Sequence, residues 1–319
     1  MGLVPALAAM ALSILAMLWL PAFLSADDAR PRIISLYAAH TEIVLRVGAR
    51  DNLVGISEQE TYDGPETQGW KRPQTFSVGD DVEKYLAANP DIILIRPQHL
   101  GSAKGLFDSL AATGIRIWVK QIIHAEELYD YWLEIGKICG KDEKASGMVA
   151  AFKEALKPYE ERTKARTKRP GVFFESVHKE VKTFTPDSIP IWVVTVSGGI
   201  NVASDAQPAR PGLVVADYGP EKLLAKASEV DVFLSQEGPM NRVPLDVIKN
   251  RTIYQALPAI KDGRAYKVPE DLVSRPTPSL IEGIALLESI FFPEGPVTAP
   301  AAAAPGAAPA SQDGQKPAN

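Results

Sequence analysis

Three of the four histidines in this chain follow segments with the composition of buried strands. They are His40 after residues 32–36, His99 after residues 91–95 and His178 after residues 171–175. In an open α/β sheet, ligands bind beyond the carboxyl ends of the strands, so these side chains are expected at the ligand-facing edge. An imidazole there can ligate a metal whose chelate leaves an open position, or exchange a proton. Loop residues are also commonly polar and exposed, which is the simpler interpretation of the same pattern.

Two further side chains belong to the same edge. Tyr37 directly follows the first predicted strand and Arg96 follows the strand 91–95. His124, the fourth histidine, begins a helical segment and is expected to be a surface or capping residue.

A short phrase occurs twice, 138 residues apart. It reads Glu83-Lys84-Tyr85-Leu86-Ala87 and Glu221-Lys222-Leu223-Leu224-Ala225, and each copy is followed by an aspartate and a run of apolar residues. This pattern predicts a short helix leading into a buried parallel strand, and therefore two α/β lobes of similar build. A carboxylate in the first turn is also favoured by the helix dipole, by roughly 0.3–1 kcal/mol, which would explain each glutamate on its own.

Several classes of chemistry have no signature in the sequence. There is no phosphate-binding glycine loop, no Gly-x-Ser-x-Gly nucleophile elbow and no histidine or carboxylate pattern with metal-ligand spacing. The single cysteine, Cys139, excludes an intrachain disulfide and is expected to be a buried, inert thiol. A net charge of -5 and a pI near 5.5 argue against nucleic acid as a partner.

Strand and helix patterns alternate along the chain, as in α/β proteins. The alternation predicts an N-terminal lobe over residues 31–138 and a C-terminal lobe over residues 170–294. Between them, residues 141–168 form a long and highly charged helical pattern, which we expect to connect the lobes as a solvated strut.

The two ends of the chain differ from the rest. Residues 3–24 are almost wholly apolar, and cleavage after Ala26 would make residues 1–26 a signal peptide; an uncleaved membrane anchor is the alternative. Either interpretation places the remaining residues outside the cytoplasmic membrane, in the periplasm or its equivalent. Residues 295–319 consist mainly of proline, alanine, glycine and glutamine, and are expected to be a disordered tail.

Several segments resemble those of a known family. They resemble, in order, the periplasmic solute-binding proteins for iron-siderophore complexes, haem and vitamin B12, and they are residues 31–43, 54–56, 77–79, Glu83, 89–94, 113–115, 257–270 and 275–278. The resemblance implies two doubly wound, three-layer lobes joined by a single long helix, with the ligand in the cleft between them. It also implies that the protein delivers a captured solute to an ABC permease, and that a glutamate on each lobe, here Glu83 and Glu221, pairs with permease arginines.

The resemblance does not fix the ligand. Arg96 and Arg275 would suit a carboxylate of a ferric chelate or an oxyanion, whereas histidines at the rim would suit a haem iron. The candidate ligand-binding residues are Tyr37, His40, Arg96, His99, His178 and Arg275. A small-molecule metal chelate of the ferric siderophore type ranks first, then haem or a corrinoid, then an oxyanion such as molybdate. Whether side chains ligate the metal stays open, and no cofactor is expected apart from the bound solute.

Two other functions fit the same scaffold. An enzyme acting on a metal cofactor would use the three loop histidines as ligands or acid-base groups, and a membrane-tethered sensor would retain the apolar N-terminal segment. Because no catalytic constellation is present, we expect a binding protein and not an enzyme.

Overall fold

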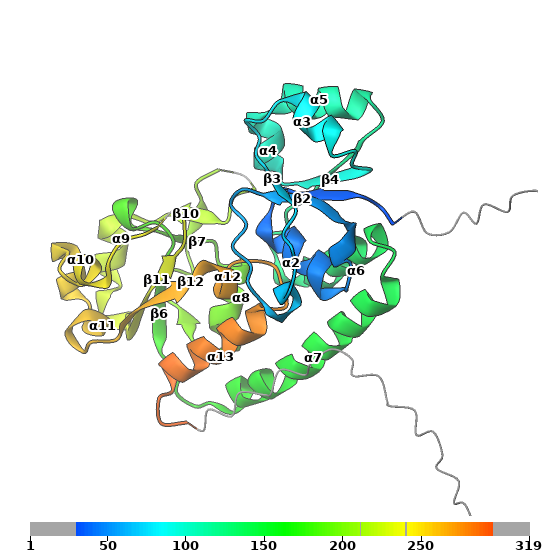
Figure 1. Cartoon of the computed structure of the whole chain (residues 1–319). Coiled ribbons are helices and arrows are strands. Elements are labelled where there is room, and N and C mark those ends of the chain that lie inside the picture. The colour runs from blue at the N-terminus through cyan, green and yellow to red at the C-terminus, as the bar shows by residue number, and fades with distance from the viewer. Residues whose placement is uncertain (1–29, 211, 240, 296–319) are drawn as a thin grey trace, which may run out of the picture.

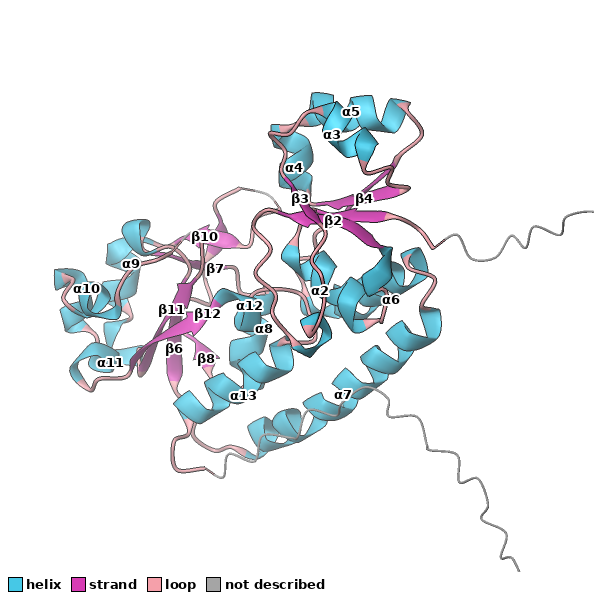
Figure 2. Ribbon diagram, in the orientation of Figure 1, coloured by secondary structure: helices cyan, strands magenta, loops and turns pink. Residues whose placement is uncertain are grey.

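The computed structural model describes residues 30–295 except 211 and 240, so the predicted signal peptide or anchor and residues 296–319 of the tail lie outside it. Within these residues the chain forms two lobes, each with a parallel β-sheet covered by helices on both faces (Figures 1 and 2). The predicted α/β class with parallel sheets is confirmed.

The N-terminal lobe contains a five-stranded sheet of order β3-β2-β1-β4-β5, in which all neighbours are parallel. Its strands are β1 (Ile33–Ser35), β2 (Leu53–Ser57), β3 (Gln74–Phe76), β4 (Ile92–Ile95) and β5 (Arg116–Val119). Helices α3 (Val82–Ala87), α4 (Pro97–Ser102) and α5 (Lys104–Ala112) cover one face, and α2 (Ala38–Arg46) and α6 (Leu128–Ile138) cover the other (Figure 2). The strand order reverses between β1 and β4.

Strand β4 shows why this sheet needs two covering layers. Every residue of β4 is buried, with Ile92 and Leu94 in one hydrophobic cluster and Ile93 and Ile95 in another. Successive side chains of a strand point to opposite faces, so an unbroken apolar run is stable only when both faces are covered.

Helix α7 (Asp142–Ala165) leads from the first lobe to the second (Figure 1). Its 24 residues span about 36 Å at 1.5 Å per residue. Five side chains spaced three or four residues apart are buried: Ala145, Val149, Phe152, Leu156 and Tyr159. The helix is therefore amphipathic and packs along one face, whereas the sequence alone suggested a solvated strut.

The C-terminal lobe contains a four-stranded parallel sheet of order β12-β11-β6-β8. Its strands are β6 (Gly171–Glu175), β8 (Ile200–Asn201), β11 (Val232–Glu237) and β12 (Ala265–Pro269). Helices α8 (Ile189–Val196), α12 (Glu270–Val273) and α13 (Leu280–Phe291) lie on one side, and α9 (Gly219–Ala225), α10 (Leu245–Lys249) and α11 (Pro258–Lys261) on the other (Figure 2).

A second, antiparallel sheet in this lobe was not predicted. It has the order β7-β10-β9, with β7 (Lys182–Phe184), β9 (Gln207–Pro208) and β10 (Val215–Asp217). Its strands have only two or three residues, too few to show a hydrophobic period. Single-turn 3-10 helices complete the described structure: Arg50–Asn52, Pro65–Thr67, Ala125–Glu127, His178–Glu180, Ala227–Glu229 and Thr252–Ala256.

The repeated phrase has a structural equivalent in the two lobes. The Asp91 carboxylate accepts a hydrogen bond from the backbone N–H of Arg32 at 2.7 Å, and Asp231 accepts one from Gly171 at 2.7 Å. Each aspartate thereby fixes the entry to the first strand of its lobe, β1 or β6, next to its own strand, β4 or β11. The two lobes were predicted to be of similar build, and at the entry to their first strands they share this hydrogen bond.

The lobes are packed against each other as well as connected. One hydrophobic cluster contains side chains of α2, α6, α7, β6 and α13. Ser279, just before α13, donates a hydrogen bond to the buried Glu42 carboxylate of α2 at 2.6 Å, and Arg46 donates to the same oxygen at 2.8 Å. Trp132 Nε1 donates to the carbonyl of Pro276 at 2.8 Å. These contacts restrict the motion of one lobe against the other.

None of the helices in the described part of the chain combines the length and apolar character needed to cross a membrane.

Candidate functional site

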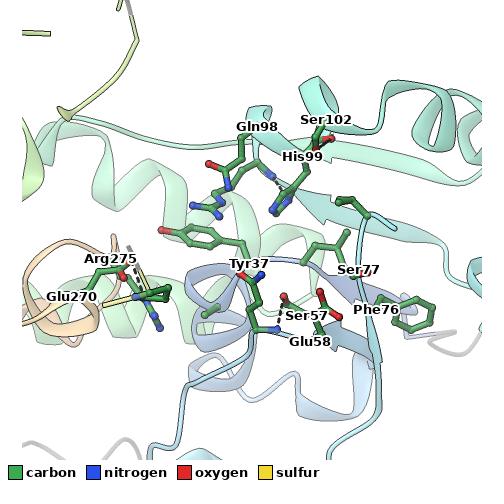
Figure 3. Close-up of a pocket in the computed structure, with 16 residues that line it drawn as sticks. Tyr37, Ser57, Glu58, Phe76, Ser77, Gln98, His99, Ser102, Glu270 and Arg275 are labelled. Atoms are coloured by element: carbon green, nitrogen blue, oxygen red, sulfur yellow. Dashed lines mark hydrogen bonds and ion pairs between the residues drawn. The ribbon is translucent and has the colours of Figure 1, made fainter. Parts of the chain in front are cut away.

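A cavity of about 440 Å³ lies at the carboxyl ends of β1 to β4, within the range of roughly 300–1,000 Å³ typical of small-molecule sites (Figure 3). Residues directly after these strands line it, including Tyr37, Glu58, Ser77 and Arg96. Tyr37 and Arg96 follow β1 and β4, between which the strand order reverses. This is the point at which open α/β sheets bind ligands.

Arg96 stacks on Tyr37 inside this cavity. The guanidinium carbon lies 4.2 Å from the centre of the Tyr37 ring, which is a cation-π contact. Arg96 Nε is buried and has no hydrogen-bond partner among the described residues, and no carboxylate in that part of the chain forms an ion pair with this arginine. An unsatisfied buried donor is costly, so this guanidinium is a strong candidate to meet an acceptor on a ligand.

The C-terminal lobe contributes a second arginine. Arg275 is 8% exposed and lies with Glu270 across the cavity from Ser57 and Ser77 (Figure 3). Its Nη1 donates to Thr61 Oγ1 of the N-terminal lobe at 2.9 Å, and its Nε lies 3.9 Å from a Glu270 carboxylate oxygen. Arg275 is therefore partly satisfied within the protein and bridges the two lobes beside the cavity.

His99 is neutral at physiological pH. Burial, aided by the nearby positive charge of Arg96, lowers its pKa to about 4. Its Nδ1 accepts a hydrogen bond from the backbone N–H of Arg96 at 3.3 Å, so its proton is on Nε2. His99 therefore offers a neutral donor, as do the side chains of Gln98, Ser57 and Ser77, which also line the cavity.

The formal charges around the cavity balance in number but not in position. The two cations are Arg96 and Arg275, and the two acids are Glu58 and Glu270. Glu58 is exposed, and Glu270 is close to Arg275. The Arg96 side of the cavity is therefore positive. Burial raises the pKa of the Tyr37 hydroxyl, although the positive charges of Arg96 and Arg275 oppose this effect. The phenol therefore stays protonated.

The structure contradicts the prediction that His40 contacts ligand. His40 lies within α2, is completely buried, and is enclosed by Tyr37, Trp118 and Tyr131 with ring centres 5.0–5.9 Å away. Burial lowers its pKa to about 3, an effect that the backbone of Lys120 near the ring opposes only partly. The helix begins immediately after the strand and turns His40 into the core, behind Tyr37.

His178 does not line the cavity either. Its Nδ1 lies 3.2 Å from both oxygens of the fully buried Glu175 carboxylate, which also receives hydrogen bonds from Ser235 and Tyr254. Asn241 accepts a hydrogen bond from the His178 backbone N–H. His178 belongs to a polar network at the carboxyl ends of β6 and β11.

Of the six predicted ligand-binding residues, Tyr37, Arg96, His99 and Arg275 are together in one cavity.

Sequence reasoning also missed lining residues. Glu58 and Glu270 directly follow β2 and β12, so the carboxyl-end rule would have found them had it been applied to acids as well as histidines. Ser77 was missed because β3 was not recognised. Within the described residues no group of three or more histidine, cysteine, aspartate or glutamate side chains could hold a metal ion.

Glu83 and Glu221 lie away from this cavity. Both are exposed in the first turns of their helices, α3 on one lobe and α9 on the other. Cys139 is buried, and burial raises the pKa of its thiol to about 12, in agreement with the predicted inert cysteine.

The fold and the position of the cavity define a substrate-binding protein with two lobes, and comparison with known proteins gives the family. The model of the periplasmic binding protein family matches residues 33–272, and the chain belongs to this family. Its members are binding proteins, which agrees with the expectation that this protein is not an enzyme.

Individual relatives are similar over most of the chain. An uncharacterized ABC transporter substrate-binding lipoprotein of Bacillus subtilis, YvrC, is 28% identical over 271 residues, which are 82% of this chain and 80% of that protein. A vitamin B12-binding protein of Yersinia pestis is 26% identical over 283 residues, 87% of this chain and 97% of that protein.

A solved structure is also similar. The structure of a possible iron-binding, periplasmic solute-binding protein of Staphylococcus epidermidis superimposes with a TM-score of 0.69 and 26% identity, over 82% of this chain and 98% of that one.

Proposed function

We propose that this protein captures an anionic metal chelate outside the cytoplasmic membrane, most favourably a ferric siderophore-type complex, and delivers it to an ABC permease. The observation that carries the proposal is Arg96, whose guanidinium stacks on Tyr37 in a cavity at the strand crossover. Arg96 is half-buried, and its buried Nε has neither a hydrogen-bond partner nor an acidic partner among the described residues. An anionic ligand group would satisfy that donor through a charge-assisted hydrogen bond.

The remaining lining residues suit the same class of ligand. The neutral His99, Gln98 and serine side chains can donate hydrogen bonds to oxygen atoms of a chelator, and Tyr37 gives apolar contact. Arg275 Nε lies 3.9 Å from a Glu270 carboxylate oxygen, and a second carboxylate of the ligand would replace Glu270 as its ion-pair partner. The metal would be held by the chelator, and Tyr37 and His99, which both line the cavity, are the side chains that we propose to complete its coordination.

Delivery is the role that we assign to Glu83 and Glu221. Both carboxylates are exposed on separate lobes, and both helices lie away from α7 (Figure 1). Two acids at a fixed separation suit a permease with two related transmembrane subunits, and their charge would steer the encounter. The packed interface between the lobes keeps that separation nearly constant. Export of the chain would use residues 1–26, either cleaved or kept as an anchor.

A corrinoid is the second candidate, because relatives with similarity along most of the chain are named vitamin B12-binding proteins. The cavity favours a smaller, anionic ligand over this one: Tyr37 and Phe76 are its only aromatic lining residues within the described structure. Two further aromatic side chains of the C-terminal lobe, Trp192 and Tyr218, pack against its hydrophobic core and do not line this cavity.

Ligand-induced stabilisation tests the proposal. Purified protein would be heated with ferric citrate, ferric catecholate and hydroxamate complexes, haem, cyanocobalamin and molybdate, each also tested without its metal where possible. A ligand at 100 times its Kd stabilises the folded state by about 2.7 kcal/mol, which raises the melting temperature measurably. A shift with a ferric chelate supports the proposal, a shift with cobalamin alone supports the second candidate, and no shift with any of them contradicts both.

A further inference from the structure

Helices α3 and α9 each expose a leucine three residues after the glutamate. Leu86 is 40% exposed and Leu224 is 43% exposed, whereas their neighbours Tyr85 and Leu223 are completely buried. Residues three apart lie on the same face of a helix. Each helix therefore presents a carboxylate and an apolar side chain side by side to solvent.

The two carboxylates are free to meet a partner. Within the described residues, neither Glu83 nor Glu221 takes part in a salt bridge or a side-chain hydrogen bond. The lysines that follow them have other contacts: Lys84 pairs with Asp80 at 2.7 Å, and the Lys222 ammonium lies 5.7 Å from the ring of Tyr218. Neither lysine forms an ion pair with the glutamate next to it in the chain.

The exposed surfaces of α3 and α9 occupy equivalent positions in the two lobes. Helix α3 leads into β4 and α9 leads into β11, and both connections are fixed by the same aspartate-to-backbone hydrogen bond. The other markedly exposed large apolar residues of the described chain do not recur in a repeated phrase: Val119, Ile200, Leu213 and Val247. Nothing within a lobe requires the leucine, because its helix is already anchored by the buried residue before it.

We propose that Leu86 and Leu224 are the apolar contacts of the permease-docking surface, each packing into a hydrophobic recess beside the cation that meets the neighbouring glutamate. This inference rests on the docking part of the proposed function. The occupant is the pair of transmembrane subunits, because only a partner with two related surfaces uses both copies. The glutamates accelerate association, and the leucines, which lose water on contact, slow dissociation.

Binding kinetics can separate these two contributions. The protein would be titrated onto its permease–ATPase complex in nanodiscs at 50 and 300 mM salt, comparing wild type, Leu86→Ser/Leu224→Ser and Glu83→Gln/Glu221→Gln. The leucine variant should dissociate at least about 10-fold faster with an unchanged response to salt. The glutamate variant should associate more slowly and lose most of its response to salt. Val247→Ser, a change at a residue 48% exposed on α10, is the matched control and should behave as wild type.

The possible failures are distinct. Wild-type kinetics of the leucine variant, together with impaired docking of the glutamate variant, would overturn this inference and leave the docking role intact. Wild-type kinetics of the glutamate variant would overturn the docking role itself. Each variant should retain the thermal shift with the ligand that the heating experiment identifies. A leucine variant that lost this shift would have a damaged fold, and the binding kinetics of the milder Leu86→Ala/Leu224→Ala variant would then decide.

Discussion

Replacing His40 by leucine should reduce the loss of stability that acid causes. His40 is completely buried among aromatic rings, and neither ring nitrogen has a hydrogen-bond partner among the residues that the structure describes. Its pKa falls from an ordinary value near 6.5 to about 3 in the folded protein, because burial disfavours the charged ring. Between these two values the unfolded chain binds a proton that the folded protein does not bind, so stability falls as the pH falls through this window.

The size of this loss in the free energy of unfolding follows from the folded and unfolded pKa values of His40. At pH 5 an unfolded imidazole with a pKa near 6.5 is almost fully protonated, which favours unfolding by about 2 kcal/mol relative to pH 7. Wild-type protein should therefore lose about 2 kcal/mol more than His40→Leu when the pH is lowered from 7 to 5. All other titrating groups are common to both proteins, so their contributions cancel in this comparison.

Urea denaturation followed by circular dichroism at both pH values measures this difference. Equal m-values for the two proteins would show that the denatured states are comparable. If His40→Leu lost as much free energy as wild type between pH 7 and pH 5, His40 would not be a buried neutral histidine and the structural role assigned to it would be wrong.

Two other outcomes follow from buried groups outside the cavity. Glu42→Ala should lower the free energy of unfolding by about 2 kcal/mol, because Ser279 and Arg46 lose their shared acceptor between the lobes, and an unchanged urea midpoint would show that this contact adds nothing. Cys139 should react with Ellman's reagent only after unfolding, because the thiol is 3% exposed and its pKa is about 12; rapid reaction of the native protein would contradict its placement in the core.

The parallel strands and the long helix could be predicted because their patterns are strong and local. The apolar run Ile92–Ile95 and the pattern from residue 142 onward define β4 and α7 without help from other parts of the chain. The antiparallel sheet escaped prediction because β9 and β10 are two and three residues long and depend on contacts distant in sequence.

Only part of the candidate site could be predicted from the sequence, and the reason is physical. The carboxyl-end rule locates the residue after a strand but not the direction of its side chain. Arg96 follows β4, and its guanidinium reaches the cavity. His40 also follows a strand, but the helix that begins at Ala38 directs it inward to the aromatic core. His178 is held by the buried Glu175, a partner that sequence spacing alone does not reveal.

Binding of the ferric chelate to Arg96→Ala tests the central claim most directly. Arg116, exposed at the amino end of β5 on the opposite edge of the sheet, gives the matched control Arg116→Ala. Loss of a charge-assisted hydrogen bond to a buried group costs roughly 1.5–3 kcal/mol, or about 10- to 150-fold in affinity. Calorimetric titration should show that loss for Arg96→Ala and wild-type affinity for Arg116→Ala. Equal affinity of Arg96→Ala and wild type for an anionic chelate would contradict the account.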